Sequence, residues 1–298
     1  MVKKIIKYNL FFILFLVISL LFINLLGFIA NKNASTITNS DKNSIVDSDN
    51  NMIELPIIMY HSLLKDEKMH NDYTISPDIF EEDLKYLKEN GYKTILVNDL
   101  INYVYSDNNL PEKCIMLTFD DGNYNNYYYA YPMLKKYDSK AIISPIASMV
   151  EKFSEYENIT VTYGTINSKQ AQEMVDSGYV EIQNHSYDLH KLTPRTGVDQ
   201  KKGESFEEYK STISKDITKA QNYIIQNIGT TPSVFVYPFG AKNEFTEKIV
   251  KELGFKCTMN CTEKLNYISK NPESLYELGR FRRDGKESIE SLLKRIYE

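Results

Sequence analysis

The chain has 298 residues, of which 42% are hydrophobic and 25% are charged, an ordinary composition for a globular protein that buries a core. Its formal net charge of −5 excludes the strongly basic composition typical of nucleic-acid-binding proteins, so we expect no nucleic-acid partner. The length fits one large domain or two small ones.

An apolar segment near the N-terminus predicts where the protein resides. Three lysines precede an apolar run over residues 10–30, in which Asn24 is the only strongly polar residue. A run of about 20 apolar residues spans a bilayer as a helix, and lysines before it favour a cytoplasmic N-terminus. Because no good cleavage site follows, we expect residues 1–30 to be an uncleaved signal-anchor, with a cleaved signal peptide as the alternative. The rest of the chain would then lie outside the cytoplasm, held at the cell membrane by a single span.

A polar segment follows the apolar run. Residues 31–52 are rich in Asn, Ser and Asp and show no hydrophobic periodicity. We interpret this stretch as a flexible linker. The folded domain is therefore expected over residues 53–298.

Strands and helices alternate along the expected domain. Short apolar runs predict strands over residues 55–60, 94–97, 114–119, 141–146, 179–184, 233–237 and 255–259. Apolar residues at helical spacing, with capping serines and terminal glycines, predict helices over residues 76–91, 127–137, 168–178, 206–228 and 244–253. This alternation predicts an α/β fold with a parallel sheet and helices outside it. The number of strands favours a distorted (β/α)7-type barrel over an open sheet.

Polar residues gather where the predicted strands end. His61 follows the first strand, Asp120 and Asp121 follow the third, His185 follows the fifth, and Pro238-Phe239-Gly240 follows the sixth. In parallel barrels the chemistry takes place at the carboxyl ends of the strands. We therefore expect these residues to share one site.

Two adjacent carboxylates, Asp120 and Asp121, follow the apolar strand CIMLTF. Neighbouring residues in an extended segment point in different directions, so one carboxylate can bind a metal while the other faces the substrate. Gly122 permits a tight turn after them. An Asp-Asp-Gly turn without a catalytic role is the alternative.

Two histidines, His185 and His190, lie five residues apart in NHSYDLH. This spacing does not stack them on one face of a helix and suits a loop that curls around an ion. A single histidine is more often structural, but two in a short loop at a strand end favour a metal site. Together with Asp121 they would supply three ligands and leave open positions, the pattern of a catalytic metal site. Asp120 could then take a proton from a water molecule that the metal activates.

Three cysteines lie beyond the apolar N-terminal run. Cys114 begins an apolar strand and is expected to be buried. Cys257 and Cys261 lie four residues apart, and both a disulfide bridge and a metal site are open for them, although an odd number of cysteines is a weak disulfide framework.

Three motifs in this order resemble a known family. TFDDG at 118–122, HSYDLH at 185–190 and YPFG at 237–240 are similar to the polysaccharide deacetylases with a NodB homology domain, carbohydrate esterase family four. The resemblance covers residues 53–298. PIIMYHSL and SPDIFEEDLKYLKENGYKT are similar to the circularly permuted branch, which includes deacetylases of the biofilm exopolysaccharide poly-N-acetylglucosamine.

The resemblance implies roles for the polar residues. It implies a NodB-like barrel in which Asp120 is the base, His61 is the acid, and Asp121, His185 and His190 bind a divalent metal. The implied metal is zinc, with cobalt or nickel as alternatives. Residues Tyr237, Pro238 and Phe239 would contact the substrate, and the Phe239 backbone N–H would stabilise the oxyanion.

The sequence departs from the family pattern in two places. The usual arginine of the third motif is missing before YPFG, and the Asp-Trp motif is absent because the chain has no Trp. Arg280 and Arg282 are both candidates for the compensating positive charge.

The implied function is removal of N-acetyl groups from a cell-surface polysaccharide, either poly-N-acetylglucosamine or peptidoglycan. The alternatives are an O-acetyl esterase acting on a polysaccharide and an inactive glycan-binding module. The Asp-Asp and His-His sets argue against the inactive module, because a protein that only binds glycans need not keep a base beside a metal site.

Overall fold

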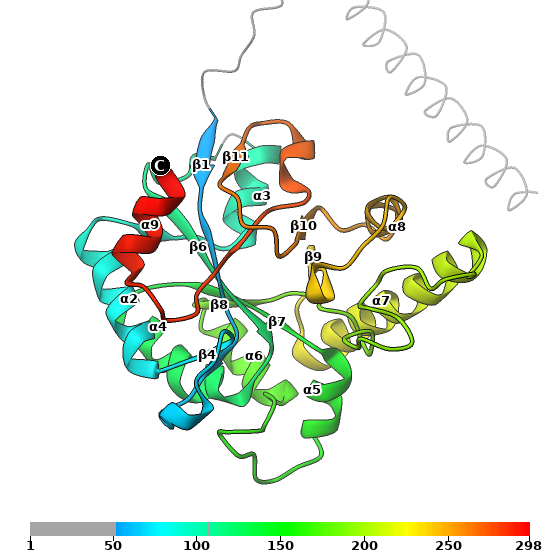
Figure 1. Ribbon diagram of the computed structural model, residues 1–298, viewed down its shortest axis with the longest axis horizontal. Helices are drawn as coiled ribbons and strands as arrows, with labels where there is room; N and C mark the ends of the chain where they lie inside the picture. Colours follow the sequence, from blue (N-terminus) through cyan, green and yellow to red (C-terminus); the bar gives the residue numbers. More distant parts are fainter. Residues whose placement is uncertain (1–51, 107) are drawn as a thin grey trace, which may run out of the picture. The chain divides into compact units, whose positions relative to one another are not determined.

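Figure 1 shows the computed structural model of the chain, which describes residues 52–106 and 108–298. The predicted signal-anchor over residues 1–30 lies outside the described residues, as does the predicted linker except for Met52. Within the described part, no helix is both long and apolar enough to cross a membrane.

The centre of the fold is a six-stranded sheet in which all paired strands run parallel. The strand order is β12 (Phe281–Arg282), β2 (Ile57–Tyr60), β6 (Cys114–Asp121), β7 (Ala141–Pro145) and β8 (Val180–Ile182), and β5 (Lys93–Thr94) pairs with the start of β6. Strand β6 is buried along almost its whole length, which explains its continuous apolar sequence. The parallel sheet confirms the predicted α/β class.

A second pair of strands extends this arrangement. β9 (Val234–Val236) and β10 (Cys257–Met259) pair parallel to each other. One isolated bridge joins Asn184, just after β8, to Phe235 of β9, and another joins Met259 of β10 to Leu278, just before β12. The bridges therefore place the second pair between β8 and the segment that leads into β12.

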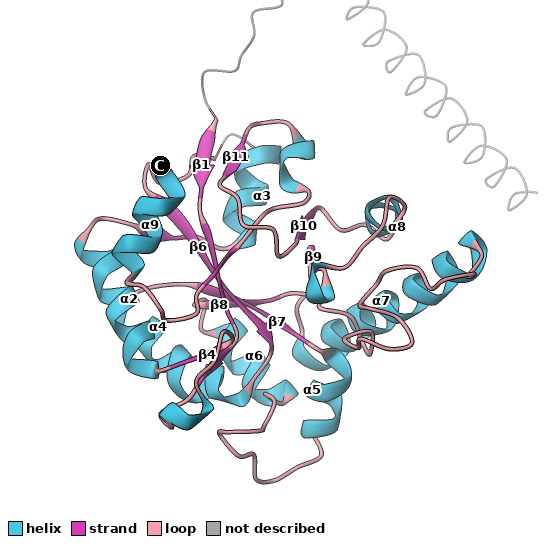
Figure 2. Cartoon of the chain, in the orientation of Figure 1, coloured by secondary structure: helices cyan, strands magenta, loops and turns pink. Residues whose placement is uncertain are grey.

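Helices flank the strands (Figure 2). Helix α2 (Pro77–Glu89) begins as predicted, since the Ser76 side chain accepts a hydrogen bond from the Asp78 N–H and Pro77 occupies the first helical position. It buries Phe80, Leu84 and Leu87, which recur at helical spacing. The other α-helices are α3 (Val97–Tyr105), α4 (Tyr131–Tyr137), α5 (Ala147–Phe153), α6 (Ser168–Asp176), α7 (Phe206–Ile228), α8 (Thr246–Glu252) and α9 (Ile289–Tyr297).

Shorter elements complete the described region. β1 (Ile53–Leu55) pairs antiparallel with β11 (Asn266–Ile268), and β3 (Ser62–Leu63) pairs parallel with β4 (Thr74–Ile75). The short helical turns are η2 (Glu67–Met69), η3 (Asn126–Ala130), η4 (Pro238–Gly240) and η5 (Pro272–Leu275). Of these, η3 is a π-helical turn that leads directly into α4.

The predicted strand over residues 94–97 is wrong after Thr94, because β5 ends there and Val97 is already the first residue of α3. Two carboxylates explain the helix start. The Asp99 side chain accepts from the Leu96 N–H, and Glu181 of β8 accepts from the N–H groups of Val97 and Asn98. These carboxylates satisfy the first free N–H groups of the helix. One of them lies 84 residues away in sequence, so local spacing could not reveal it.

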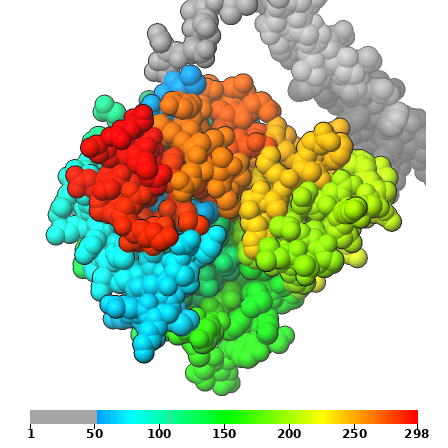
Figure 3. Space-filling model, viewed as in Figure 1, coloured from blue at the N-terminus to red at the C-terminus, as the bar shows by residue number. Residues whose placement is uncertain are grey.

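The core divides around β6. Its side chains alternate, so Ile115, Leu117 and Phe119 join one apolar cluster while Cys114 and Met116 join another. Helix α9 packs against α2, which brings the C-terminal segment (red) beside an early helix (cyan) in Figures 1 and 3. The sequence did not predict α3, α5, α9, β3, β4, β11 or β12.

Candidate active site

A cleft of about 900 Å³ opens where β2, β6, β8 and β9 end. The predicted residues His61, Asp120, Asp121, His185 and His190 all line it. Its remaining lining includes Tyr73, Tyr163, Phe239, Cys261, Glu263 and Arg282. The arrangement matches the expectation that polar residues at the carboxyl ends of parallel strands share one site.

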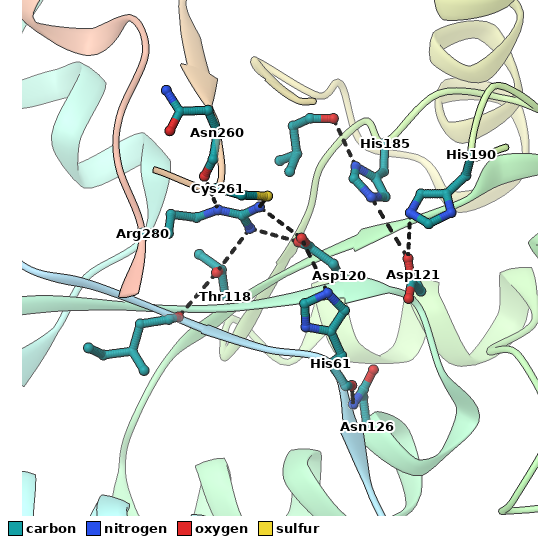
Figure 4. A network of polar contacts seen from close by, with 12 residues as sticks. His61, Thr118, Asp120, Asp121, Asn126, His185, His190, Asn260, Cys261 and Arg280 are labelled. Carbon is teal, nitrogen blue, oxygen red and sulfur yellow. Dashed lines mark hydrogen bonds and ion pairs between the residues drawn. The ribbon is translucent and has the colours of Figure 1, made fainter. Parts of the chain in front are cut away.

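Asp121, His185 and His190 converge within this cleft (Figure 4). One potential ligand atom from each lies within 4.8 Å of the others. The Asp121 Oδ1 atom is 3.3 Å from His190 Nε2 and 3.8 Å from His185 Nε2. Asp121 adopts a left-handed backbone conformation with φ 68°, which turns its side chain out of the strand direction at the end of β6.

A backbone hydrogen bond fixes the orientation of His185. Its Nδ1 lies 2.8 Å from the Val236 carbonyl oxygen on β9. A carbonyl only accepts hydrogen bonds, so Nδ1 carries the proton and Nε2 is left with a free lone pair. That lone pair is on the atom nearest Asp121. Outer contacts of this kind hold histidine ligands in many metal sites.

The electrostatics of the three side chains suit a cation. Burial lowers the pKa of His185 and of His190, which favours the neutral imidazoles that bind metals. Burial raises the pKa of Asp121, against the opposing charges of His185 and His61, and a bound cation would favour its ionised form.

These residues fit a divalent metal ion. Asp121 Oδ1 is buried and has no hydrogen-bond partner among the described residues, which is a costly arrangement unless something else binds it. Two imidazoles and one carboxylate form a donor set suited to zinc and related ions. Three ligands from the protein would leave positions open for substrate.

Asp120 lines the same cleft and forms a buried, bidentate pair with Arg280 (Figure 4). Arg280 Nη1 donates to Oδ1 at 2.7 Å and Nη2 donates to Oδ2 at 2.8 Å. Burial alone would raise the pKa of Asp120, but the charges of Arg280, His185 and His61 and the Arg280 hydrogen bonds outweigh it and hold the pKa well below its usual range. Asp120 is therefore ionised at neutral pH.

Arg280 is fully buried and held from several sides. Its Nε donates to the Asn260 carbonyl at 2.9 Å, and Nη1 also approaches Thr118 Oγ1 at 3.3 Å. The structure thus decides between the two candidate arginines. Arg282 instead lies at the rim of the cleft, with its guanidinium 5.3 Å from the centre of the Tyr73 ring.

His61 lies beside Asp120 in the same cleft. Its Nε2 is 4.0 Å from Asp120 Oδ2, and its ring meets the edge of Tyr73 at 4.9 Å. The Nδ1 atom is buried without a hydrogen-bond partner among the described residues. Asn126 positions the backbone of His61 by donating to its carbonyl oxygen at 2.8 Å.

Of the three residues of the YPFG segment that were predicted to contact the substrate, only Phe239 lies in the cleft, so the prediction is wrong for Tyr237 and Pro238. Phe239 lines the cleft in a left-handed conformation (φ 59°), and its ring lies 4.2 Å from the His190 ring, centre to centre. Tyr237 and Pro238 are buried, and Tyr237 packs in the core against Phe235. Neither of their side chains is among those that line the cleft.

The three cysteines are all free. Cys114 is buried, as predicted, and so is Cys257. Cys261 lines the cleft, with its sulfur 3.9 Å from Arg280 Nη2. The disulfide considered for Cys257 and Cys261 is therefore not formed.

Comparison with known proteins places this site in a family. A family model described as Polysaccharide deacetylase matches residues 107–258, slightly more than half of the chain. The Bacillus subtilis polysaccharide deacetylase homologue YxkH is 31% identical over 232 residues, which cover 77% of this chain and 71% of that protein. This chain belongs to the polysaccharide deacetylase family. The family match includes Asp120, Asp121, His185 and His190.

Two further relatives are more specific in name. The poly-beta-1,6-N-acetyl-D-glucosamine N-deacetylase of Staphylococcus aureus is 28% identical over 193 residues, 65% of this chain. The matched region spans 63% of that relative's length. A solved de-N-acetylase from Aggregatibacter actinomycetemcomitans superposes with a TM-score of 0.70 at 26% identity, covering 81% of this chain and 99% of that one.

Proposed function

We propose that this member of the polysaccharide deacetylase family is a metal-dependent hydrolase that removes N-acetyl groups from amino sugars of a cell-surface polysaccharide. The observation that carries the proposal is the Asp120 carboxylate, held by Arg280, next to the three converging candidate ligands Asp121, His185 and His190 in one open cleft. The names of the staphylococcal relative and of the solved de-N-acetylase support N-acetylglucosamine as the sugar. We infer that a poly-N-acetylglucosamine polymer is the preferred substrate, ahead of peptidoglycan.

The arrangement divides the reaction between the three candidate metal ligands and two residues that transfer protons. A divalent ion held by Asp121, His185 and His190 would polarise the acetyl carbonyl and make an attacking water more acidic. Asp120 accepts the proton of that water as it attacks the carbonyl carbon. His61 delivers a proton to the nitrogen as the carbon–nitrogen bond breaks, so acetate and a free amine leave. The Phe239 backbone N–H donates to the developing oxyanion.

The aromatic rim of the cleft supports a carbohydrate substrate. Tyr73, Tyr163 and Phe239 line the cleft and are 50%, 77% and 42% exposed. Exposed aromatic faces beside a polar site suit rings that have both apolar faces and polar edges.

We propose zinc as the ion, because the donor set of two imidazoles and one carboxylate suits it, with cobalt or nickel as substitutes. We also propose that the strands close into the distorted (β/α)7-type barrel of a NodB domain. One isolated bridge joins the end of β8 to β9, β9 pairs with β10, and the other isolated bridge joins β10 to the segment before β12. The signal-anchor over residues 1–30 would hold the domain outside the cell membrane.

The test is acetate release by the full-length chain in detergent. Oligomers of β-1,6-linked N-acetylglucosamine, peptidoglycan and an O-acetylated polysaccharide are supplied in parallel, with a chelator and with zinc added back. We expect release from the N-acetylated oligomers, loss with the chelator and recovery with zinc. Release from the O-acetylated polymer alone would overturn the assignment in favour of an esterase. Binding of the oligomers without any acetate release would indicate a glycan-binding module.

A further inference from the structure

The loop that carries both candidate histidine ligands has an unusual backbone. Between His185 and His190 the chain bends at residues 187–188, and Ser186 adopts a left-handed conformation with φ 69°. A non-glycine residue in this region is strained and persists only where the surroundings enforce it. Contacts from two helices, α7 and α5, hold residues 186–188 in place.

One side of the loop is held by a carboxylate on α7. Asp216 Oδ1 accepts from the Tyr187 N–H at 2.7 Å, and Asp216 Oδ2 accepts from the Asp188 N–H at 3.0 Å. Each oxygen of the Asp216 carboxylate thus accepts a hydrogen bond from one of two consecutive backbone N–H groups of the loop. Hydrogen bonds to an ionised acceptor are stronger than those between neutral groups.

The other side of the loop is held by the start of α5. The N–H groups of Ala147 and Ser148 donate to the carbonyl oxygens of Ser186 and Tyr187 at 3.1 and 3.0 Å. The preceding residue, Ile146, donates to the Asp121 carbonyl at 3.4 Å. One short stretch of backbone therefore touches the segments that carry Asp121 and the two histidines.

The side chain of Tyr187 closes the arrangement. Its hydroxyl donates to a carboxylate oxygen of Glu151 on α5, and Lys219 of α7 lies 3.6 Å from the centre of its ring. Tyr187 is therefore fixed between the same two helices that hold the loop backbone. Two donors of the loop are thus satisfied by α7 and two acceptors by α5, while the N–H groups of Ser186 and Leu189 are satisfied within the segment, by Asn184 Oδ1 and Ser186 Oγ.

We infer that Asp216 is a positioning residue for the metal centre, which holds residues 186–188 so that His185 and His190 converge on Asp121. Asp216 does not line the cleft and touches no reacting atom. The inference rests on the proposed function of Asp121, His185 and His190 (the triad) as metal ligands. It adds a residue about 30 positions from the histidine motif, on a helix for which the sequence suggested no functional role.

A purely structural role for Asp216 predicts a different result. If the carboxylate only stabilised the fold, its loss would lower the melting temperature of the metal-free chain, and the molecules that remained folded would bind metal as before. If it positions the loop, metal affinity itself falls. Affinity of the folded chain is therefore the readout that separates the two roles.

The experiment measures Zn²⁺ affinity of the full-length chain in detergent by competition with a chromophoric chelator. Asp216→Ala removes both acceptors, and we expect roughly 10–100-fold weaker binding, the range seen when outer contacts of metal ligands are removed. Asp216→Asn has the same shape and keeps one acceptor oxygen, so we expect a smaller loss. Glu207→Ala, which removes an exposed carboxylate from the same helix, should leave the affinity unchanged. Far-ultraviolet circular dichroism and the metal-free melting temperature identify variants that remain folded.

The outcomes separate the inference from the proposed function. Wild-type affinity in folded Asp216→Asn and Asp216→Ala chains would overturn the positioning role, while loss of binding in His185→Ala would still support the metal site. Wild-type affinity in His185→Ala would instead overturn the metal site itself. If Asp216→Ala does not fold, the isosteric Asp216→Asn variant decides alone.

Discussion

The pairing of Asp120 with Arg280 joins a candidate base to a permanent positive charge inside the protein. Both side chains are buried, and the two hydrogen bonds have the fork geometry that only arginine provides. A buried ion pair is strongly destabilised when one partner is removed, because the other is left charged and unpaired. Arg280 thus affects both the ionisation of the base and the stability of the fold.

Replacing Arg280 should therefore reduce both activity and stability. In Arg280→Met, burial would raise the pKa of Asp120 with much less opposition, which favours the protonated form, so acetate release should fall by about 100-fold or more. We expect about 3–5 kcal/mol of lost unfolding free energy, measured by chemical denaturation. Arg280→Lys keeps the charge without the fork and should be intermediate in both. Wild-type turnover in Arg280→Met would contradict this account.

Asp120 and His61 should be needed for turnover and dispensable for metal binding. A positioned base or acid contributes about 10²–10⁴-fold to the rate, so Asp120→Asn and His61→Ala should each lower kcat by that order. Metal content of the purified variants, measured by mass spectrometry, should match wild type. His70→Ala is the matched control, since that ring lies outside the cleft and contacts the Leu64 carbonyl oxygen. Near-normal kcat in a folded, metal-loaded His61→Ala chain would remove His61 from the mechanism.

Tyr163 should act on substrate binding and leave the chemical step unaffected. Its ring is 77% exposed at the edge of the cleft and touches none of the polar groups that react. Loss of one aromatic contact, about 0.5–1.5 kcal/mol, should raise KM roughly 2- to 10-fold in Tyr163→Ala with kcat unchanged. Tyr156→Ala, on the same loop and 50% exposed but outside the cleft lining, should have normal kinetics. An equal fall in kcat would show that Tyr163 acts in the transition state.

At the level of the elements, sequence patterns predicted most strands and helices of the domain and located every side chain of the triad. They succeeded where the signal is local, as in the Ser76-Pro77 start of α2 and the continuous apolar run of β6. They failed where the deciding contact is distant. The Glu181 carboxylate that accepts from the first N–H of α3 lies 84 residues away in the sequence. Arg280 and its partner Asp120 are 160 residues apart in the sequence. Nothing in the neighbourhood of Arg280 distinguishes it from Arg282 or Arg283.

A second buried ion pair links β12 and its neighbouring loop to α2. Arg283 donates two hydrogen bonds to Asp83 of α2, at 2.8 and 2.9 Å, and Tyr60 donates a third. Asp83→Ala should lower the unfolding free energy by about 3–5 kcal/mol, because Arg283 would be left buried and unpaired. Glu82→Ala, an exposed position next to it on the same helix, should change stability by less than about 0.5 kcal/mol. A similar effect of both substitutions in chemical denaturation would contradict this role.

At the scale of the whole molecule, the signal-anchor and the linker are predictions about residues 1–52. If they hold, protease added to intact cells should cut within residues 31–52, because an extended polar segment exposes its backbone. The released fragment should begin in that range, as measured by N-terminal sequencing, and should retain acetate-releasing activity. Lysed cells provide the control for total cleavage. Protein found only in the cytosol would contradict the predicted location.

The order of strands in the central sheet also affects when the sheet can form while the ribosome makes the chain. β2 lies between β12 and β6, and Ile58 of β2 is paired with Phe281 of β12, more than 200 residues later. A ribosome adds about 5–20 residues per second, so His61 and Asp120 are made many seconds before Arg280. During that interval the Asp120 carboxylate has no guanidinium partner, and the edge of β2 that pairs with β12 has no neighbouring strand. The nascent chain therefore cannot pair its candidate base with Arg280 until residue 280 has been translated and has emerged from the ribosome.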